Sequence, residues 1–292
     1  MVQAAIIEAE SIAEATARLY RQINTELRPD VRRAIADARE SEGSPVARDI
    51  LAALLENEQI SRADGIPLCQ DTGLAVAFVD MGNRVVVAGG TVQDAIDEGI
   101  RRAATAHPLR ASTLRTPLGR VNAGDNTPAI VHLEQVEGDE LTIHLLAKGG
   151  GAENMSRVVM LTPSAGREGV LGAIVETVRQ AGANPCPPII VGVGLGGNFE
   201  RSALLAKRAL LRDLGEPHPD PELAALEREA LDRVNALGIG PQGLGGRTTA
   251  LAVLVEQAPC HIASLPLAVN LECHSHRHGR ISLHAGQPGN SG

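Results

Sequence analysis

The sequence predicts a mixed α/β fold in which a helical N-terminal layer packs on a core that contains β-sheet. Apolar residues recur at helical spacing in the N-terminal part, whereas the chain from Pro67 onward consists of short apolar runs separated by turns. The 31 glycines and 17 prolines provide many positions at which turns can form. We therefore expect residues 1–65 to form the helical layer, 66–277 the core and 278–292 a disordered tail.

The helical layer is expected to contain three helices. Apolar residues between Ile7 and Ile23 recur at roughly helical spacing, and Tyr20 extends this stripe. Pro29-Asp30 interrupts the pattern, which restarts directly afterwards. Pro45 predicts the beginning of the third helix, because proline is well tolerated in a first helical turn.

The core is expected to contain both strands and helices, without a repeat or a clear domain linker. The candidate strands are Leu74–Val79, Arg84–Val87, Ala129–Leu133, Leu141–Leu146 and Ile189–Val193. Met81-Gly82-Asn83 predicts a hairpin or tight connection between the first two. The expected helices are Thr91–Ala104 with Thr91 as its cap, Arg167–Ala181, Ala203–Leu211 and Glu222–Leu237.

The composition excludes several classes of protein. With 27 basic and 35 acidic residues the formal net charge is -8, which argues against a polyanion-binding face. Only three aromatic residues are present, so the stacking platforms of single-stranded nucleic acid binders are not expected. No apolar run is long enough to span a membrane. Glu8 and Glu10 interrupt the stretch that a signal peptide would need, so a cytoplasmic location is expected.

The four cysteines are the first indication of chemistry. No two of them form a C-x-x-C pair, so a zinc ribbon or thioredoxin-type motif has no support. Cys69, Cys186 and Cys273 lie in or beside segments rich in proline, glycine or polar residues, where side chains can converge on a ligand. They could meet around one metal centre, or they could be small buried hydrophobic residues, and position alone leaves both readings open.

Zinc is a weaker alternative in the segment from Cys273 to His278. In an extended chain His274, His276 and His278 would share one face and Cys273 the other. One strand cannot easily arrange four ligands around a tetrahedral ion.

Two glycine-rich segments resemble nucleotide-binding loops only in part. Gly192–Gly197 lacks the G-x-G-x-x-G spacing, so a tight strand-to-helix turn is favoured. Gly245–Thr249 has arginine where a phosphate loop carries lysine.

Three other segments carry groups suited to an anionic substrate. Lys148-Gly149-Gly150-Gly151 could form either an anion-binding nest or a flexible turn. Arg110 could hold a carboxylate through two hydrogen bonds, although a lone arginine is usually solvated. Asp71 could shuttle a proton if Cys69 bound a metal, or it could cap the turn at Asp71-Thr72-Gly73.

Six strings in the same order resemble the α subunit, or N-terminal catalytic region, of the class I iron–sulfur fumarate hydratase and L-tartrate dehydratase family. They are Pro-Leu-Cys-Gln-Asp-Thr-Gly at 67–73, Ala-Lys-Gly-Gly-Gly at 147–151, Asn-Pro-Cys-Pro-Pro at 184–188, Gly-Val-Gly-Leu-Gly-Gly-Asn-Phe-Glu at 192–200, Leu-Gly-Ile-Gly-Pro-Gln-Gly-Leu-Gly-Gly-Arg-Thr-Thr-Ala at 237–250 and Cys-His-Ile-Ala-Ser-Leu-Pro-Leu-Ala-Val-Asn at 260–270. The likeness covers the chain except for about its last dozen residues.

The resemblance implies a [4Fe–4S] cluster held by Cys69, Cys186 and Cys273, with its fourth iron open as a Lewis acid and Cys260 left over. That chemistry suits reversible addition of water to fumarate, with Asp71 handling the proton on the hydroxyl. By the same resemblance, the carboxylates of a small dicarboxylate substrate would be held by Gln70, Arg110, Gly151, Asn154 and His261.

The resemblance also implies a partner and a choice of substrate. The proton-abstracting group of the family comes from a C-terminal domain or a separate β subunit, and this chain ends shortly after Cys273, so a β subunit in an α2β2-type assembly is expected. Pro259–Ser264 and Cys273-His274 favour the fumarase branch, with tartrate and mesaconate as alternatives. His276 and His278 match no feature of the family. A non-catalytic zinc or regulatory module is the alternative from a different class.

Overall fold

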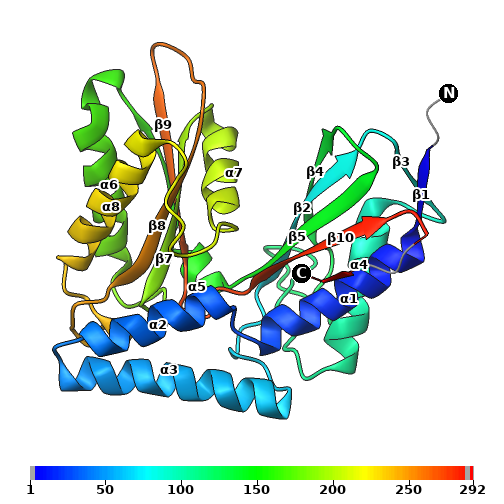
Figure 1. Ribbon diagram of the computed structural model, residues 1–292, viewed down its shortest axis with the longest axis horizontal. Helices are drawn as coiled ribbons and strands as arrows, with labels where there is room; N and C mark the ends of the chain where they lie inside the picture. The colour runs from blue at the N-terminus through cyan, green and yellow to red at the C-terminus, as the bar shows by residue number, and fades with distance from the viewer. Residues whose placement is uncertain (1–3, 287–289, 292) are drawn as a thin grey trace. The chain divides into compact units, whose positions relative to one another are not determined.

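The computed structural model describes residues 4–286 and 290–291, and its internal contacts divide the chain into two units (Figure 1). Unit 1 comprises Met1–Arg28, Glu58–Lys148 and Arg277–Gly292. Unit 2 comprises Pro29–Asn57 and Gly149–His276. Neither unit is one continuous segment of the chain, and both combine helices with sheet. The predicted mixed α/β fold is therefore confirmed, whereas the predicted division at residues 65 and 277 stays a prediction.

Unit 1 is built on a five-stranded sheet. The strand order is β11-β10-β5-β2-β4, formed by Asn290–Ser291, His278–His284, Glu140–Lys148, Leu74–Gly82 and Ile130–Val136. Strand β2 runs parallel to β4 and antiparallel to β5. Helices α1 (Ala9–Thr25) and α4 (Val92–Ala106) pack closely together, because Gly99 leaves room for the backbone of α1: a Cβ there would lie 2.5 Å from the carbonyl oxygen of Ala13. A small parallel pair, β1 (Ala5–Glu8) and β3 (Val85–Ala88), completes the unit.

Unit 2 is built on a four-stranded sheet that helices cover on both faces. The strand order is β6-β9-β7-β8, formed by Arg157–Leu161, Leu265–Glu272, Ile189–Gly196 and Ala250–Ala258. Helices α6 (Gly166–Ala181) and α8 (Pro221–Asn235) pack on one face, and α7 (Phe199–Ala209) packs on the other (Figure 1). The remaining helices are α2 (Pro29–Ser41), α3 (Pro45–Asp64), whose last residues belong to unit 1, and the short α5 (Gly150–Glu153).

The glycines of Gly192–Gly197 serve helix packing in unit 2. A Cβ at Gly194 would lie 1.9 Å from the carbonyl oxygen of Ser202, and one at Gly192 would lie 2.2 Å from that of Ala206. Helix α7 can therefore lie directly against β7, which confirms the tight strand-to-helix turn favoured over a dinucleotide-binding loop.

The expected helices are all present, and Thr91 caps α4 by accepting the N–H of Asp94. Strands β2 and β3 lie in different sheets and are joined by a tight turn, so of the two expected alternatives the tight connection is confirmed and the hairpin is not formed. The expectation for the C-terminal tail is wrong. Residues 278–284 of the expected disordered tail form β10, because they pair antiparallel along β5 and bury Ile281 and Leu283. Residues 287–289 and 292 of that tail lie outside the described part.

No helix among the described residues is both long and apolar enough to cross a lipid bilayer.

Candidate functional site

The loop that follows α3 carries three of the predicted site residues in unit 1. The backbone N–H of Asp71 donates to the Cys69 sulfur at 3.5 Å, and the Cys69 thiol donates to Oε1 of Gln70 at 3.4 Å. Oδ1 of Asp71 accepts the N–H of Gly73 at 2.8 Å, which is the turn-capping contact expected for this residue. Gly73 permits the turn because its φ is +76°. Gln70 is exposed and Cys69 half-buried, so both are accessible.

The segment that carries Arg110 lies against this loop. The hydroxyl of Ser112 donates to Oδ1 of Asp71 at 3.2 Å, and its backbone N–H donates to Oδ1 of Asn126 at 2.6 Å. Asn126 is fully buried and also donates to the carbonyl oxygen of Arg110 at 3.0 Å. The Arg110 backbone is thus fixed near Asp71, while its side chain is exposed. Unit 1 therefore brings together Cys69, Gln70, Asp71 and the Arg110 segment.

In unit 2 the turns around Cys186 and Cys273 are neighbours. Nδ1 of His274 lies 3.0 Å from the carbonyl oxygen of Cys186, and the side-chain amide of Gln242 donates to the carbonyl oxygen of Pro187 at 2.9 Å. Cys186 has a φ of +57°, which is uncommon for a residue with a side chain. Its side chain is exposed, whereas Cys273 is buried with its sulfur 2.9 Å from the hydroxyl oxygen of Ser275. The sequence therefore folds so that the residues beside two cysteines, far apart in the chain, touch.

Helix α5 adds the glycine-rich segment to the same end of unit 2. A Cβ at Gly151 would lie 3.6 Å from the carbonyl oxygen of Asn184, two residues before Cys186. Asn154 follows α5 directly and is exposed. Glu153 anchors the helix: its carboxylate pairs with Lys207 of α7 and accepts from Asn270 of β9 at 2.9 Å. Gly150 and Gly151 therefore begin a short helix, whereas the sequence predicted either an anion-binding nest or a flexible turn.

His261 and Cys260 lie at the other end of the same sheet. The loop between β8 and β9 contains both residues, whereas Cys273 directly follows the far end of β9. The eight residues of β9 span about 25 Å. Within the loop, Nδ1 of His261 accepts the N–H of Ala263, and the Cys260 thiol donates to the carbonyl oxygen of Ser264. In unit 2, therefore, His261 is remote from the pair of cysteine turns.

The zinc pattern from Cys273 to His278 is not an extended strand. Residues 273–277 form a turn and β10 begins only at His278, so the three histidines do not share one strand face. Within the described part of the chain, no three His, Cys, Asp or Glu side chains are grouped as metal ligands. None of the four cysteines takes part in a disulfide bond.

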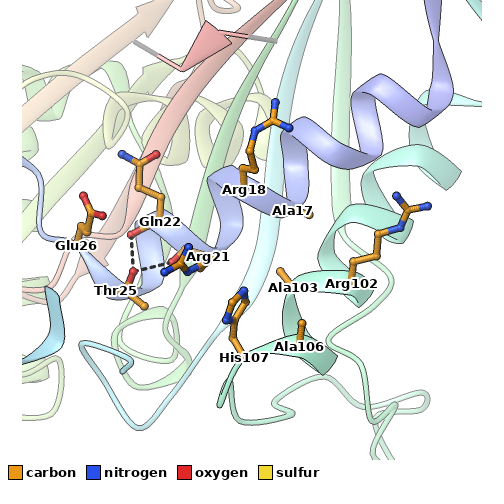
Figure 2. Close-up of a pocket in the computed structure, with 10 residues that line it drawn as sticks. All are labelled: Ala17, Arg18, Arg21, Gln22, Thr25, Glu26, Arg102, Ala103, Ala106 and His107. Atoms are coloured by element: carbon orange, nitrogen blue, oxygen red, sulfur yellow. Dashed lines mark hydrogen bonds between the residues drawn. The ribbon is translucent and has the colours of Figure 1, made fainter. Parts of the chain in front are cut away.

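A separate hollow lies along α1 and α4 in unit 1 (Figure 2). It has a volume of about 460 Å³ and is lined by basic side chains, among them Arg18, Arg102 and His107. The guanidinium of Arg102 is already paired with the carboxylates of Glu10 and Glu98. None of the predicted site residues lines this hollow.

The structure adds residues that the sequence reasoning missed. Ser112 and Arg277 contact the Asp71 loop, Asn126 holds the segment of Arg110 and Ser112, and Glu153 anchors α5. Their partners lie 14 or more residues away in sequence, so no local motif marks them. The only available signal was their chemistry: polar side chains next to apolar runs need a partner when buried.

Cysteine thiols outside disulfide bonds, a carboxylate held beside one of them and a glycine-rich helix beside the turn of another are kinds of group that enzymes use to act on small polar substrates. Comparison with known proteins makes the assignment specific. The chain matches the model of the fumarate hydratase (Fumerase) family over residues 13–282. It therefore belongs to this family, and it is a hydro-lyase, an enzyme that adds or removes water.

The similar curated proteins carry the name of another member of the group. A protein of Methanocaldococcus jannaschii named "Putative L(+)-tartrate dehydratase subunit alpha" is 40% identical over 282 residues, which cover 94% of this chain and 99% of the relative. The L(+)-tartrate dehydratase subunit alpha of Escherichia coli strain UTI89 is 33% identical, covering 94% of this chain and 91% of the relative. The K12 protein of the same name is 32% identical. The resemblance to the family is thus confirmed, and the names of these relatives do not favour the fumarase branch.

Proposed function

We propose that this chain is the α subunit of an iron–sulfur hydro-lyase that reversibly hydrates fumarate to (S)-malate, in the reducing environment of the cytoplasm. The observation that supports this most directly is the loop at Cys69–Gly73, where a carboxylate is fixed two residues from a free thiol. Hydration needs both a site for an electrophilic centre and a group that moves a proton beside it.

The cysteines suit a [4Fe–4S] cluster by the kind of donor they offer. Thiolates are the usual ligands of such clusters, and hydrogen bonds to sulfur tune them. Cys69 already accepts the N–H of Asp71, and the turns of Cys186 and Cys273 are hydrogen-bonded neighbours. We assign these three cysteines as ligands, whereas Cys260 lies in the remote loop between β8 and β9 and is not one. When bound, a cluster with one iron not ligated by the protein supplies a Lewis acid.

Asp71 handles the proton on oxygen in the proposed mechanism. The N–H of Gly73 and the hydroxyl of Ser112 fix its carboxylate, so its position is set before substrate arrives. In the hydration direction Asp71 accepts a proton from water as the oxygen adds to one carbon of the double bond. The other carbon receives its proton from a group on a second subunit. In dehydration both transfers reverse, and atoms and charge balance in either direction.

We assign the substrate carboxylates to donors at five positions. Gln70 and Arg110 are exposed beside the Asp71 loop, and an arginine can hold a carboxylate through two parallel hydrogen bonds. Gly151 and Asn154 lie at α5, beside the Cys186 turn. His261 is also assigned to substrate, although its loop lies at the opposite end of β9 from Cys273.

We further propose a β subunit as partner, in an α2β2-type assembly. The names of the similar relatives support this, because each is called subunit alpha. We expect the chain alone, reconstituted with iron and sulfide, to bind a cluster but not to turn over any diacid. Turnover without a partner would overturn the assignment of a separate β subunit.

L(+)-tartrate dehydration is the second candidate, favoured by the names of the relatives. The deciding experiment is an anaerobic assay of the chain with its β partner against fumarate, L(+)-tartrate and mesaconate. We expect the highest kcat/KM with fumarate. A higher kcat/KM with L(+)-tartrate or mesaconate would make that diacid the substrate in place of fumarate. Asp71→Asn should retain the iron content and lower kcat by at least about 100-fold. Full activity in that variant would refute the role of Asp71.

A further inference from the structure

Arg277 is a buried cation that contacts the proposed catalytic loop. Its side chain is only 1% exposed, and the residue lies directly before β10 in unit 1. Nη1 donates to the backbone carbonyl oxygen of Asp71 at 2.6 Å and to Oδ1 of Asn24 at 3.1 Å. Burying a guanidinium is costly unless its surroundings compensate the charge. A residue that served only to fill this space would not need a charge.

Asn24 connects the same contact to the end of α1. Its backbone carbonyl oxygen accepts the N–H of Leu68 at 2.8 Å, and its side-chain amide donates to the carbonyl oxygen of Tyr20 at 2.8 Å. The loop is therefore attached to the end of α1 at two points: directly at Leu68, and at Asp71 through Arg277. Cys69 and Gln70 lie between these two attachments.

The remaining donors of Arg277 show that this contact, rather than an ion pair, determines its orientation. Nε and Nη2 find no hydrogen-bond acceptor among the described residues. Nη1 makes the hydrogen bonds of the side chain to the described residues, and both acceptors are uncharged oxygens. Tyr20 lies close to the same group: burial raises the pKa of its hydroxyl well above the usual range, Arg277 opposes this rise and Asp71 adds to it.

We propose that Arg277 is a positioning residue for the hydration reaction. It fixes the Cys69–Asp71 segment through the carbonyl oxygen of Asp71, and so determines where the Asp71 carboxylate meets the substrate. The guanidinium itself does not contact substrate. The effect of Arg277 on the reaction rests on the proposed function, because Arg277 acts through Asp71. The attachment of the loop by Arg277 does not, because it is a property of the chain alone.

The attachment is tested first without activity, by hydrogen exchange of the full chain. We compare Arg277→Gln and Arg277→Lys with Arg280→Gln, which alters an exposed arginine on β10. Arg277→Gln should raise exchange at Leu68–Gly73 by at least about tenfold, with a smaller rise in Arg277→Lys, whereas the control leaves it unchanged. Unchanged exchange in Arg277→Gln would overturn the proposal. Should Arg277→Gln fail to fold, Arg277→Lys decides. The increase in hydrogen exchange must then be confined to Leu68–Gly73, and an equal increase across β5 would overturn the proposal.

Tyr20 gives an independent check that the variants are folded. It is the only tyrosine, and the chain contains no tryptophan, so intrinsic emission from the isolated chain reports this site alone. Arg277→Gln should shift or change the intensity of this emission while far-ultraviolet circular dichroism stays as in the wild type. An emission identical to that of Arg280→Gln would contradict the close contact of Arg277 with this site.

The kinetic test asks whether Arg277 acts through Asp71. With the β partner, Arg277→Lys should lower kcat about tenfold or more while KM changes less than about threefold. In the Asp71→Asn background the same substitution should change residual kcat less than about threefold, because the group it positions is already disabled. Equal losses in both backgrounds would overturn the proposal. If the wild type turned over none of the diacids, the proposed function would fail, and the exchange experiment would still decide the attachment.

Discussion

The carboxylate of Glu42 offers the sharpest test of how much a buried hydrogen-bonded group contributes to the stability of this fold. It begins the connection between α2 and α3, and its side chain is buried. Oε1 accepts the N–H groups of Gly43 at 2.8 Å and Ser44 at 3.0 Å, and Oε2 accepts the N–H of Arg247 at 2.8 Å. Burial by itself would raise the pKa of this carboxyl, but the backbone N–H donors outweigh it and hold the pKa below its usual value.

Glu42→Gln keeps the shape of the side chain and replaces one acceptor by a donor. Whichever way the amide is oriented, its NH₂ group faces at least one backbone N–H, either that of Arg247 or those of Gly43 and Ser44. The variant thus loses one or two of these three hydrogen bonds outright, removes the charge from the rest and leaves a buried donor unpaired. We expect the free energy of unfolding at pH 7 to fall by about 2–3 kcal/mol.

The sign of the pH dependence follows from the lowered pKa. A carboxyl whose pKa is lower in the folded state stabilises the fold above its unfolded value of 4.5, and this contribution is lost as pH falls through the folded pKa. The difference between wild type and Glu42→Gln should therefore be complete at pH 7 and shrink below pH 4.5.

The assay is urea unfolding of the full chain, followed by circular dichroism at a series of pH values. Glu40→Gln is the matched control, because Glu40 lies two residues earlier with a side chain 74% exposed and should change stability by less than about 0.5 kcal/mol. Equal effects of the two substitutions, or a Glu42→Gln effect that grows as pH falls, would refute the reasoning.

Three further outcomes are expected. Cys186→Ser should prevent assembly of the cluster in anaerobic reconstitution, measured as iron bound per chain, while Cys260→Ser retains most of it; equal losses would contradict the ligand assignment. Thr91→Ala removes the cap that accepts an N–H in the first turn of α4 and should cost about 1 kcal/mol in urea unfolding, so an unchanged midpoint would show that water replaces the cap. Gly194→Ala places a methyl group 1.9 Å from the backbone of α7 and should lower the melting temperature. The control Gly172→Ala, where no atom lies within 4 Å, should lower it far less. Similar melting temperatures of the two variants would mean that α7 shifts at little cost.

The helices could be predicted from the sequence because each carries its own signal. The apolar stripe of α1, the proline that begins α3 and the cap of α4 all lie within one or two turns of the residues they determine. Strand partners are different. Strand β10 has a polar composition, and only its pairing with β5, more than 130 residues earlier, buries Ile281 and Leu283. A signal that lies in the partner cannot be read from the strand itself.

The same distinction separates the chemistry of the candidate site from its construction. The residue types beside Cys69, Cys186 and Cys273 indicated which reactions the turns could support, since those types are local. The groups that hold these turns come from elsewhere: Ser112 and Arg277 reach the Asp71 loop, and His274 reaches the Cys186 turn.

The loop at Gly245–Thr249 shows why a local motif can mislead about its ligand. Its glycines resemble part of a phosphate loop, and backbone N–H groups in such a loop do attract an anion. In the structure the anion is the carboxylate of Glu42, about 200 residues earlier in the chain, which receives the N–H of Arg247. Both a phosphate and a buried glutamate satisfy the same donors, so the motif predicts negative charge without identifying its source. Gly246 must also lack a Cβ, because one there would lie 3.0 Å from Oε2 of Glu42 and 2.8 Å from the Cβ of Ala47. The glycine that suggested a ligand site is required here by an internal contact of the fold.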